Sequence, residues 1–280
     1  MIYEHEIPSL SRLYFGKSAK LKRDIEAIAS DILYQEHYEE IATPVFSYHQ
    51  HDSIDEQELI RFSDNQNHII SLRADSTLDI VRIITKRLGK SSNQKKWFYI
   101  QPVYKFPSLE VNQIGVEEIE NSDLSYSIND SARVLNALKL QPLLQISNIN
   151  IPRLIAKELN LSLDLFKNAN LEAILSLNIS WLSKLAYLQK VSQIDTLVDE
   201  VPSTLKVELL KIKSLCDLID YPNIVIAPLY YAKMQYYDNL FFRYIHNNET
   251  LGMGGNYNHR DLNATGFALY TDKLIEEMSE

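Results

Sequence analysis

The chain has 280 residues, enough for one large domain or two ordinary ones, and 45% of them are hydrophobic, so a substantial core can form. The formal net charge is -9, which argues against a broad nucleic-acid-binding surface because phosphate binding depends on clustered Lys and Arg. Cys216 is the single cysteine, which excludes an intrachain disulfide.

Neither a membrane segment nor a metal site is predicted. No uninterrupted apolar run is long enough to span a bilayer, and the first ten residues lack the apolar centre of a signal peptide. We therefore expect a cytoplasmic protein without membrane contact. His49 and His51 flank Gln50 without a Cys cluster or a helical His pair, so we expect neither metal nor cofactor. The basic run at 86–96 is interpreted as a solvated loop.

The first elements in chain order are a helix and a strand. Apolar residues recur at helical spacing over 20–37, which predicts one amphipathic helix. The next segment, 39–48, changes to β-branched and aromatic residues and predicts a strand. Pro44 confines that strand to an edge or a bulge, since proline cannot donate a ladder hydrogen bond.

Three further strands and one helix are predicted before residue 121. Residues 68–73 read as a short strand, and the helix that follows would be capped by Asp75 or Ser76. Residues 97–106 and 111–120 predict two strands. The loop between these two strands is short, which favours an antiparallel hairpin.

The pattern changes from residue 129 to about residue 221, where glycine is absent and the apolar spacing is mostly helical. We interpret 129–221 as an inserted helical subdomain within one core domain that spans 1–280. After it, the sequence predicts strands at 223–227, 236–246 and 264–269, a glycine-rich turn at 252–256, and a last helix at 271–278.

Strands on both sides of the helical stretch predict one antiparallel sheet assembled from distant segments, with helices packed against it. The expected fold class is therefore α+β. Periodicity alone permits this arrangement without specifying its topology.

Four stretches arrive in a fixed order: LRADST at 72–77, YIQPVYKF running into VNQIGVEEIE at 99–120, MQYYDNLFF at 234–242, and MGGNYN with ATGFALYTDKL at 253–274. In order and spacing they resemble the catalytic core of histidyl-tRNA synthetase, a class II aminoacyl-tRNA synthetase. The resemblance implies the antiparallel sheet flanked by helices that is typical of that class. It also implies that 129–221 is an addition to that core.

The resemblance implies a ligand site at Gln113 and Glu117. They match the glutamine and glutamate of the family's H-Q-x-G-x-E strand, which face the bound amino acid. Being four residues apart, they project from one face of an extended strand, about 13 Å from each other. A carboxylate there could hold an α-ammonium group. In the alternative reading, Glu117 is simply an acid on a partly wet strand.

Two further pairs match residues that line the amino-acid site of the family. Asp75 and Thr77 hold the acid and threonine positions of its L-R-P-E-G-T segment, although a helix-capping role also explains Asp75. Tyr236 and Tyr237 align with the two tyrosines of its R-G-L-D-Y-Y signature. They should line any pocket that survives, although tyrosine pairs in strands also serve as core packing.

The charged groups of adenylation are replaced. Lys105, Ala232 and Lys273 stand where the family has arginines. Lysine lacks the two-pronged donor geometry that fits a phosphate, and alanine supplies no cation at all. Tyr270 replaces a glycine that allows ATP to approach. The resemblance thus implies a chain that is not an adenylating enzyme.

The sequence ends six residues beyond Leu274, so we expect no anticodon-binding domain. A synthetase core without adenylation residues and without that domain resembles the regulatory subunits of ATP phosphoribosyltransferase, the first enzyme of histidine biosynthesis. This resemblance implies a non-catalytic subunit that the short catalytic subunit needs for activity and feedback control. It also implies a dimer formed through roughly 20–48, histidine as an effector, and no tRNA partner.

Two alternatives stay open from the sequence. Lys105 and Lys273 keep positive charge, so the chain could be an amino-acid-activating paralogue with altered specificity. It could also be an interaction module without a small-molecule ligand, with the former pocket packed shut by Tyr270, Phe241 and Phe242.

Overall fold

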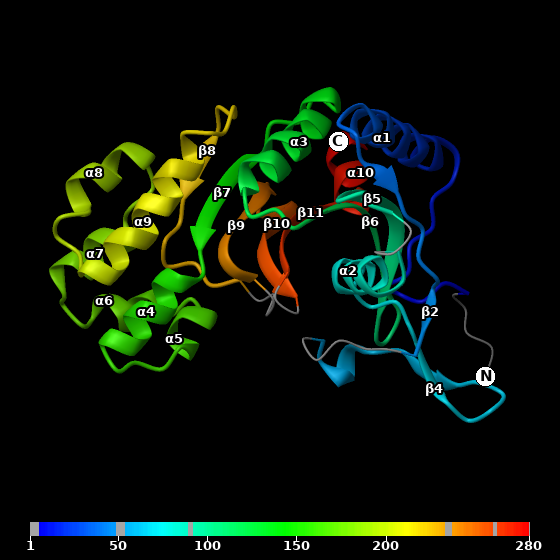
Figure 1. Cartoon of the computed structure of the whole chain (residues 1–280), viewed down its shortest axis with the longest axis horizontal. Coiled ribbons are helices and arrows are strands. Elements are labelled where there is room, and N and C mark those ends of the chain that lie inside the picture. Colours follow the sequence, from blue (N-terminus) through cyan, green and yellow to red (C-terminus); the bar gives the residue numbers. More distant parts are fainter. Residues whose placement is uncertain (1–5, 49–53, 89–91, 233–236, 260–261, 280) are drawn as a thin grey trace. The chain divides into compact units, whose positions relative to one another are not determined.

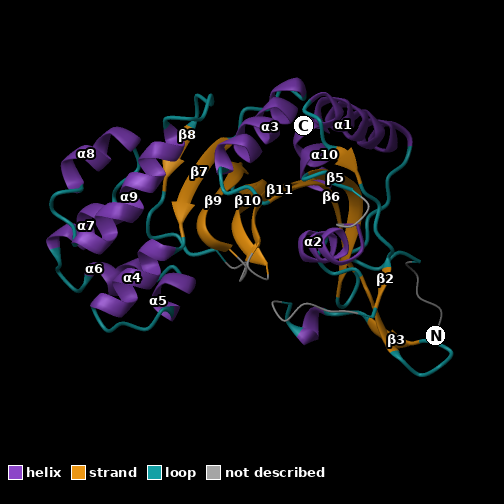
Figure 2. Cartoon of the chain, viewed as in Figure 1, coloured by secondary structure: helices purple, strands orange, loops and turns teal. Residues whose placement is uncertain are grey.

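The computed structural model describes residues 6–48, 54–88, 92–232, 237–259 and 262–279 (Figure 1). The chain divides into two compact units. Unit 1 comprises Met1–Ile119 and Ala268–Glu280, and unit 2 comprises Glu120–Phe267. Both contain strands with helices beside them (Figure 2), which confirms the predicted α+β class. None of the helices within the described ranges is long and apolar enough to cross a membrane.

Unit 1 begins with helix α1 (Gly16–Gln35), as the apolar spacing predicts. Ile25, Ala29 and Leu33 recur every four residues and are fully buried, so a single face of the helix packs against the core. Apart from Glu26, which is buried and paired with Lys22 and Arg23, the other described positions of α1 are exposed or half-buried. Burial of that stripe explains why the helix forms although its N-cap residue, Phe15, has no side-chain hydrogen-bond acceptor.

The main strands of unit 1 are β5 (Lys96–Lys105) and β6 (Leu109–Ile119), which form the predicted antiparallel hairpin. Strand β1 (Glu39–Glu40) pairs with β5 in parallel, giving the order β1-β5-β6. The sheet of unit 1 is therefore mixed rather than purely antiparallel.

A small second sheet in unit 1 has the order β2-β4-β3, made by β2 (Phe46–Ser47), β4 (Ile69–Leu72) and β3 (Arg61–Ser63). The single strand predicted at 39–48 is thus wrong, because its two ends belong to different sheets. Pro44 lies at the break, and Arg73 donates to the carbonyl oxygens of Thr43 (2.8 Å) and Pro44 (3.3 Å) where ladder bonds would otherwise run.

Helix α2 (Thr77–Ile83) follows β4, with Ser76 as its N-cap residue, and a π-helical turn (Ile84–Leu88) extends it. A 3-10 turn (Glu56–Glu58) precedes β3. The last helix of unit 1, α10 (Thr271–Ser279), also forms as predicted.

A buried carboxylate fixes α10 to distant parts of unit 1. Asp272 accepts hydrogen bonds from the Asn112 backbone N–H (2.8 Å), from the Asn112 side-chain amide (3.0 Å) and from the Tyr14 hydroxyl (2.5 Å). Burial and the bond to Asp272 raise the pKa of Tyr14 above its ordinary value. Asp272 therefore joins the segment before α1, the strand β6 and the helix α10.

The sheet of unit 2 has the order β11-β10-β9-β7-β8. Its strands are β11 (Leu262–Tyr270), whose last three residues belong to unit 1, β10 (Glu249–His259), β9 (Tyr237–His246), β7 (Leu143–Asn148) and β8 (Ile224–Ile226). Strands β9 and β10 form an antiparallel hairpin, and β7 pairs with β8 in parallel. The turn of the hairpin is Asn247–Asn248, both at positive φ, which asparagine tolerates well.

The glycine-rich segment 252–256 is part of β10, so the predicted turn there is wrong. A Cβ on Gly254 would lie 2.3 Å from the Gly266 carbonyl oxygen, and one on Gly255 would lie 2.7 Å from Phe241 Cβ. These glycines allow close packing inside the sheet rather than a reversal of the chain.

The stretch predicted as mostly helical contains α3 (Leu124–Ala137), α4 (Asn150–Glu158), α5 (Asp164–Lys167), α6 (Leu171–Leu175), α7 (Ser180–Ala186), a 3-10 turn (Val191–Gln193), α8 (Ile194–Leu197) and α9 (Ser203–Cys216). It also contains β7, which the sequence analysis missed. A short, mostly apolar segment such as 143–146 (LLQI) cannot be told from a buried helix by periodicity. The boundaries of the insertion, 129–221, stay a prediction.

Candidate functional site

Four of the candidate residues belong to unit 1, and two of these lie on β6. Gln113 and Glu117 are two residues to either side of Gly115, so their side chains leave the same face of the strand. Gln113 is half-buried, whereas Glu117 is 1% exposed. Glu117 is therefore an interior carboxylate and not an acid on a wet strand.

The neighbouring acid, Glu118, points to the opposite face of β6. Its Oε1 accepts a hydrogen bond of 2.6 Å from the buried Tyr38 hydroxyl. Glu117 and Glu118 thus have different surroundings although they are adjacent in the chain.

The ring of Tyr99 covers the strand between Gln113 and Glu117. Tyr99 on β5 is directly opposite Gly115, and a Cβ on Gly115 would lie 2.1 Å from Tyr99 Cζ and 2.2 Å from its hydroxyl oxygen. The phenol thus lies flat over the one residue of β6 that has no side chain. Gln113 and Glu117 flank this ring rather than an open strand surface.

Three of the four candidates in unit 1 converge on that phenol. Burial raises the pKa of Tyr99 well above its ordinary value, and the carboxylates of Glu117 and Asp75 raise it further, while a hydrogen bond with the Thr77 side chain opposes the rise. Tyr99 stays a neutral hydroxyl at physiological pH. Tyr270 at the end of β11 is also near enough to contribute.

A buried polar network holds the segment that carries Asp75 and Thr77. The Gln101 side-chain amide donates to the hydroxyls of Ser76 (3.0 Å) and Thr43 (3.1 Å). The Ser76 hydroxyl therefore accepts this bond and makes no capping bond to α2. Arg73, 3% exposed, donates through Nε to the Pro102 carbonyl oxygen at 2.9 Å, in addition to its bonds to Thr43 and Pro44.

The guanidinium of Arg73 is thus occupied by backbone carbonyls. Burial lowers the pKa of Arg73 from its ordinary value, although nearby tyrosines and Asp79 oppose this. The site in unit 1 combines two carboxylates with neutral hydroxyls and amides. Such a donor and acceptor set suits a cationic ammonium group better than a phosphate.

Tyr237 belongs to unit 2 and is a core residue there. Its ring stacks on Phe241 with the centroids 5.7 Å apart, and both pack with Ile149 and Ala232. Tyr236 lies outside the described residues, and a role of this tyrosine pair in a ligand pocket stays a prediction.

Where the family has arginines, this chain has two lysines, each close to a carboxylate of unit 1, and one alanine. Lys105 Nζ lies 2.5 Å from Glu58 Oε2, and Lys273 Nζ lies 2.9 Å from Glu276 Oε2. Ala232 is fully buried. Among the described residues, no group of three or more His, Cys, Asp or Glu side chains could hold a metal ion; His49 and His51 lie outside that part of the chain.

The sequence analysis named Asp75, Thr77 and Glu117 as candidates, whose ligand role stays a prediction, and did not name Tyr99. The available signal was the pairing of a glycine with an aromatic residue across the predicted hairpin. Once the hairpin register is known, Gly115 is opposite Tyr99, and a glycine inside a strand often marks the close approach of another group, here the Tyr99 ring.

Comparison with known proteins supports the resemblance. The family model of histidyl-tRNA synthetase matches residues 15–274. A protein of Wolinella succinogenes named ATP phosphoribosyltransferase regulatory subunit is 46% identical over 280 residues, which cover 99% of this chain and 97% of the relative. One of Helicobacter hepaticus with the same name is 40% identical over 278 residues, with 99% of each chain covered.

Solved structures show the same fold. A Bacillus halodurans protein described as ATP phosphoribosyltransferase regulatory subunit/histidyl-tRNA synthetase has a TM-score of 0.88 at 21% identity, covering 100% of this chain and 84% of that one. Histidyl-tRNA synthetase from Nostoc has a TM-score of 0.80 at 12% identity, with 99% and 76% covered. The chain therefore belongs to the histidyl-tRNA synthetase family and groups within it with the ATP phosphoribosyltransferase regulatory subunits.

Proposed function

We propose that this chain is the regulatory subunit of ATP phosphoribosyltransferase in histidine biosynthesis and has no catalytic activity of its own. The observation that carries the proposal is the 46% and 40% identity to two proteins of that name over almost the whole length of all three chains. The partner is the short catalytic subunit, which needs this chain for activity and for feedback control. Regulation then rests on binding the active and inactive forms of the catalytic subunit with different affinity.

The surroundings of the adenylation positions support a non-catalytic role. Adenylate formation needs cations that stabilise developing negative charge. Ala232 offers none and is packed among apolar side chains. Lys105 is paired with Glu58 at the surface, and a lysine held by a carboxylate is a poor substitute for a free arginine fork.

The direct test is an assay of phosphoribosyl-ATP formation by the short catalytic subunit of the same genome, with and without this chain. We expect activation together with co-elution of the two proteins on a sizing column. Absence of both activation and complex would overturn the proposal. Amino-acid-dependent ATP–pyrophosphate exchange by this chain alone would instead support the amino-acid-activating alternative.

For the effector site, we propose that Asp75, Thr77, Gln113 and Glu117, with Tyr99 between the last two, bind the α-ammonium group of histidine. The support is chemical: two carboxylates and several neutral acceptors face one region of unit 1, and the nearest arginine is used by carbonyl groups. Calorimetry with histidine should be carried out on the isolated chain and on the complex.

Glu117→Gln should weaken histidine binding at least about tenfold, because the charge-assisted hydrogen bond is lost. Glu118→Gln is the matched control, since it changes the adjacent acid on the other face and leaves an acceptor for Tyr38. Equal effects of the two substitutions, or no binding by the unmodified chain and the complex, would remove the effector site. The regulatory proposal would stand, because activation is measured without histidine.

Two further parts of the proposal concern assembly and location. We propose that the chain dimerises through roughly residues 20–48 and works in the cytoplasm. Exposed apolar side chains on this segment are consistent with such an interface: Tyr34 is 51%, Phe46 59% and Tyr48 63% exposed. Phe46→Asp should shift the sizing profile from dimer to monomer, and an unchanged dimer would place the interface elsewhere.

A further inference from the structure

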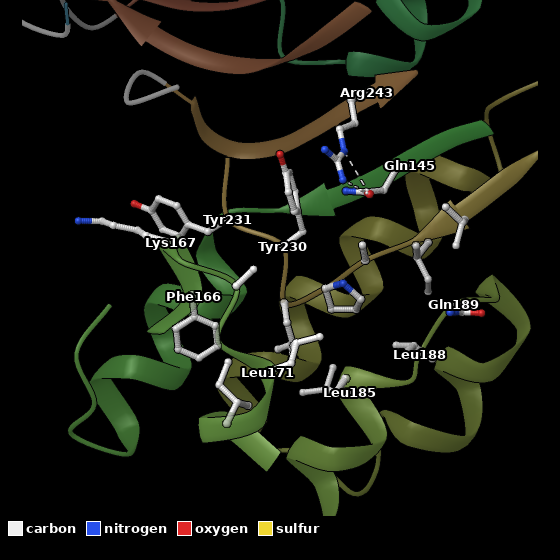
Figure 3. A pocket seen from close by; sticks show the side chains of 18 of the residues that line it. Gln145, Phe166, Lys167, Leu171, Leu185, Leu188, Gln189, Tyr230, Tyr231 and Arg243 are labelled. Atoms are coloured by element: carbon white, nitrogen blue, oxygen red, sulfur yellow. Dashed lines mark hydrogen bonds between the residues drawn. The ribbon is translucent and has the colours of Figure 1, made fainter. Parts of the chain in front are cut away.

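We propose that unit 2 holds a binding site for a small organic anion with a flat, mostly apolar body, in the cavity beside Arg243 (Figure 3). The cavity has a volume of about 760 Å³ and lies wholly within residues 145–243. Its walls come from β7, from helices α5 to α7, from the segment after β8, and from β9. This volume lies in the range of small-molecule sites.

Arg243 supplies the charge. Its Nε and Nη2 both donate to Oε1 of Gln145, at 3.2 and 2.9 Å. Gln145 lies on β7, directly opposite Arg243 on β9. The guanidinium carbon of Arg243 also lies 4.0 Å from the centroid of the Tyr230 ring. Both contacts are to neutral groups, so they orient the guanidinium without neutralising it. Within the described residues, no carboxylate forms an ion pair with Arg243.

The charged side chains that line the cavity favour an anionic ligand. It contains two cationic side chains, Arg243 and Lys167, and no Asp or Glu among the described residues. Lys167 is half exposed and lies 3.4 Å from Asp164, so its pairing is weak. The ammonium group of a zwitterionic amino acid would therefore find no carboxylate among the described lining residues. The cavity therefore differs in chemistry from the carboxylate-lined site of unit 1.

The other lining residues are mostly apolar or aromatic and favour a ligand with a flat apolar ring. Figure 3 shows Arg243, Gln145 and Tyr230 gathered at one end, with Leu171 and Leu185 at the other. Leu185 and Phe166 line the cavity and are buried, whereas Leu171 is 48% exposed. A ligand with its anionic group at Arg243 would lay its ring against Tyr230 and cover these apolar side chains.

The test is calorimetry on the full chain with three probes that share one ring system: 2-naphthoate, 2-naphthyl phosphate and neutral 2-naphthamide. We expect the two anions to bind and the amide to bind at least tenfold more weakly. The first two probes decide whether a carboxylate or a phosphate is the preferred group. Binding of the anions should also weaken with added salt, since the contact is electrostatic.

Four variants assign the binding to this cavity. Arg243→Gln should lower the affinity for the anions at least tenfold and leave that for the amide unchanged, while Arg243→Lys should recover part of the loss. Ala186→Phe, which fills the cavity without changing its polar groups, should weaken all three probes. Lys206→Gln removes a positive charge from the exposed surface of the same unit and should change nothing.

Several outcomes would overturn the proposal. Equal binding of amide and anions would mean an apolar cavity without anion recognition, and unchanged affinity in Arg243→Gln would mean a site elsewhere. No binding of any probe at millimolar concentration would also reject the site. If Arg243→Gln did not fold, as judged by circular dichroism, Ala186→Phe and the amide comparison would still decide. These assays use the chain alone, so they do not depend on the regulatory role.

Discussion

Gly115 has no room for a side chain, because the ring of Tyr99 covers it on the opposite strand. A methyl group there would push the ring and, with it, the hydroxyl that Asp75, Thr77 and Glu117 surround. The packing of this one pair therefore supports the geometry of the candidate site in unit 1.

We expect Gly115→Ala to lower the free energy of unfolding by about 2 kcal/mol, since it overpacks a buried contact. Urea denaturation followed by circular dichroism measures this. The double variant Gly115→Ala/Tyr99→Ala should be markedly more stable than the sum of the two single changes predicts, because the new methyl then meets no ring. Strict additivity would show that the pair is not in contact.

Cys216 is the last residue of α9 and is half-buried. Burial, with a smaller contribution from Asp217, raises the pKa of the thiol to about 12. Only the thiolate reacts with disulfide reagents, so at pH 8 the folded chain should react at least about a hundredfold more slowly than the chain in urea. A colorimetric thiol assay at pH 8 tests this. Equally fast reaction before and after denaturation would contradict the burial of Cys216.

At the residue scale, the sequence identified the acids of the site better than the side chains that hold them. Asp75 and Glu117 could be found because their types and spacing match a family motif. Tyr99 could be found only through the register of the predicted hairpin, and the role of Gln101 depends on its contact with the 73–76 segment. Those are contacts between distant parts of the chain, which no local pattern encodes.

At the element scale, errors arose where packing overrides local preference. A run containing Gly254 and Gly255 predicts a turn, yet both glycines lie inside β10, where neighbouring groups leave no room for a Cβ. The true turn, Asn247–Asn248, needs positive φ and was the weaker signal. Strand β7 was missed because a short segment with three apolar residues, Leu143, Leu144 and Ile146, suits a buried strand and a buried helix equally.

The hairpin of β3 and β4 depends on the turn residue Asp64. Its Oδ1 accepts the backbone N–H groups of Gln66 (2.8 Å) and His68 (2.9 Å), and its Oδ2 accepts the Tyr48 hydroxyl at 2.8 Å. These bonds, with that from the His68 backbone the strongest, hold the pKa of Asp64 well below its ordinary range. A depressed pKa in the folded state means that the ionised carboxylate stabilises the fold.

We therefore expect Asp64→Asn to lower the melting temperature at pH 7. The difference from the unmodified chain should shrink as the pH falls below about 4, the ordinary pKa of an aspartate, because Asp64 then binds a proton more readily in the unfolded chain than in the folded one, whereas the asparagine has no group that titrates. Thermal unfolding at pH 7 and pH 3 measures this, with the exposed Asp199→Asn as control. A difference that persists unchanged at pH 3 would rule out the charge as its cause.

At the scale of the whole molecule, the order of motifs gave the family, and the comparisons confirm it. Composition alone excluded little beyond a broad nucleic-acid surface. The division into two units was not predicted, because contacts between Met1–Ile119 and the last thirteen residues become visible only once the chain has folded.

The net charge of -9 leads to one prediction for the complete chain. Phosphate backbones bind through clustered cations, so we expect no saturable binding of tRNA at about 10 μM protein in physiological salt. Filter binding tests this, with a histidyl-tRNA synthetase as positive control. Tight binding that weakens steeply with added salt would contradict the proposed absence of a tRNA partner.

The bonds of Asp272 have a consequence for the order in which the chain can fold. Asp272 joins Tyr14 and Asn112, which precede it by 258 and 160 residues. On the ribosome, all of Glu120–Phe267 is synthesised before these bonds can form. The contiguous unit can therefore begin to fold during translation, whereas Tyr14 and Asn112 must wait until α10 has been synthesised to obtain their partner.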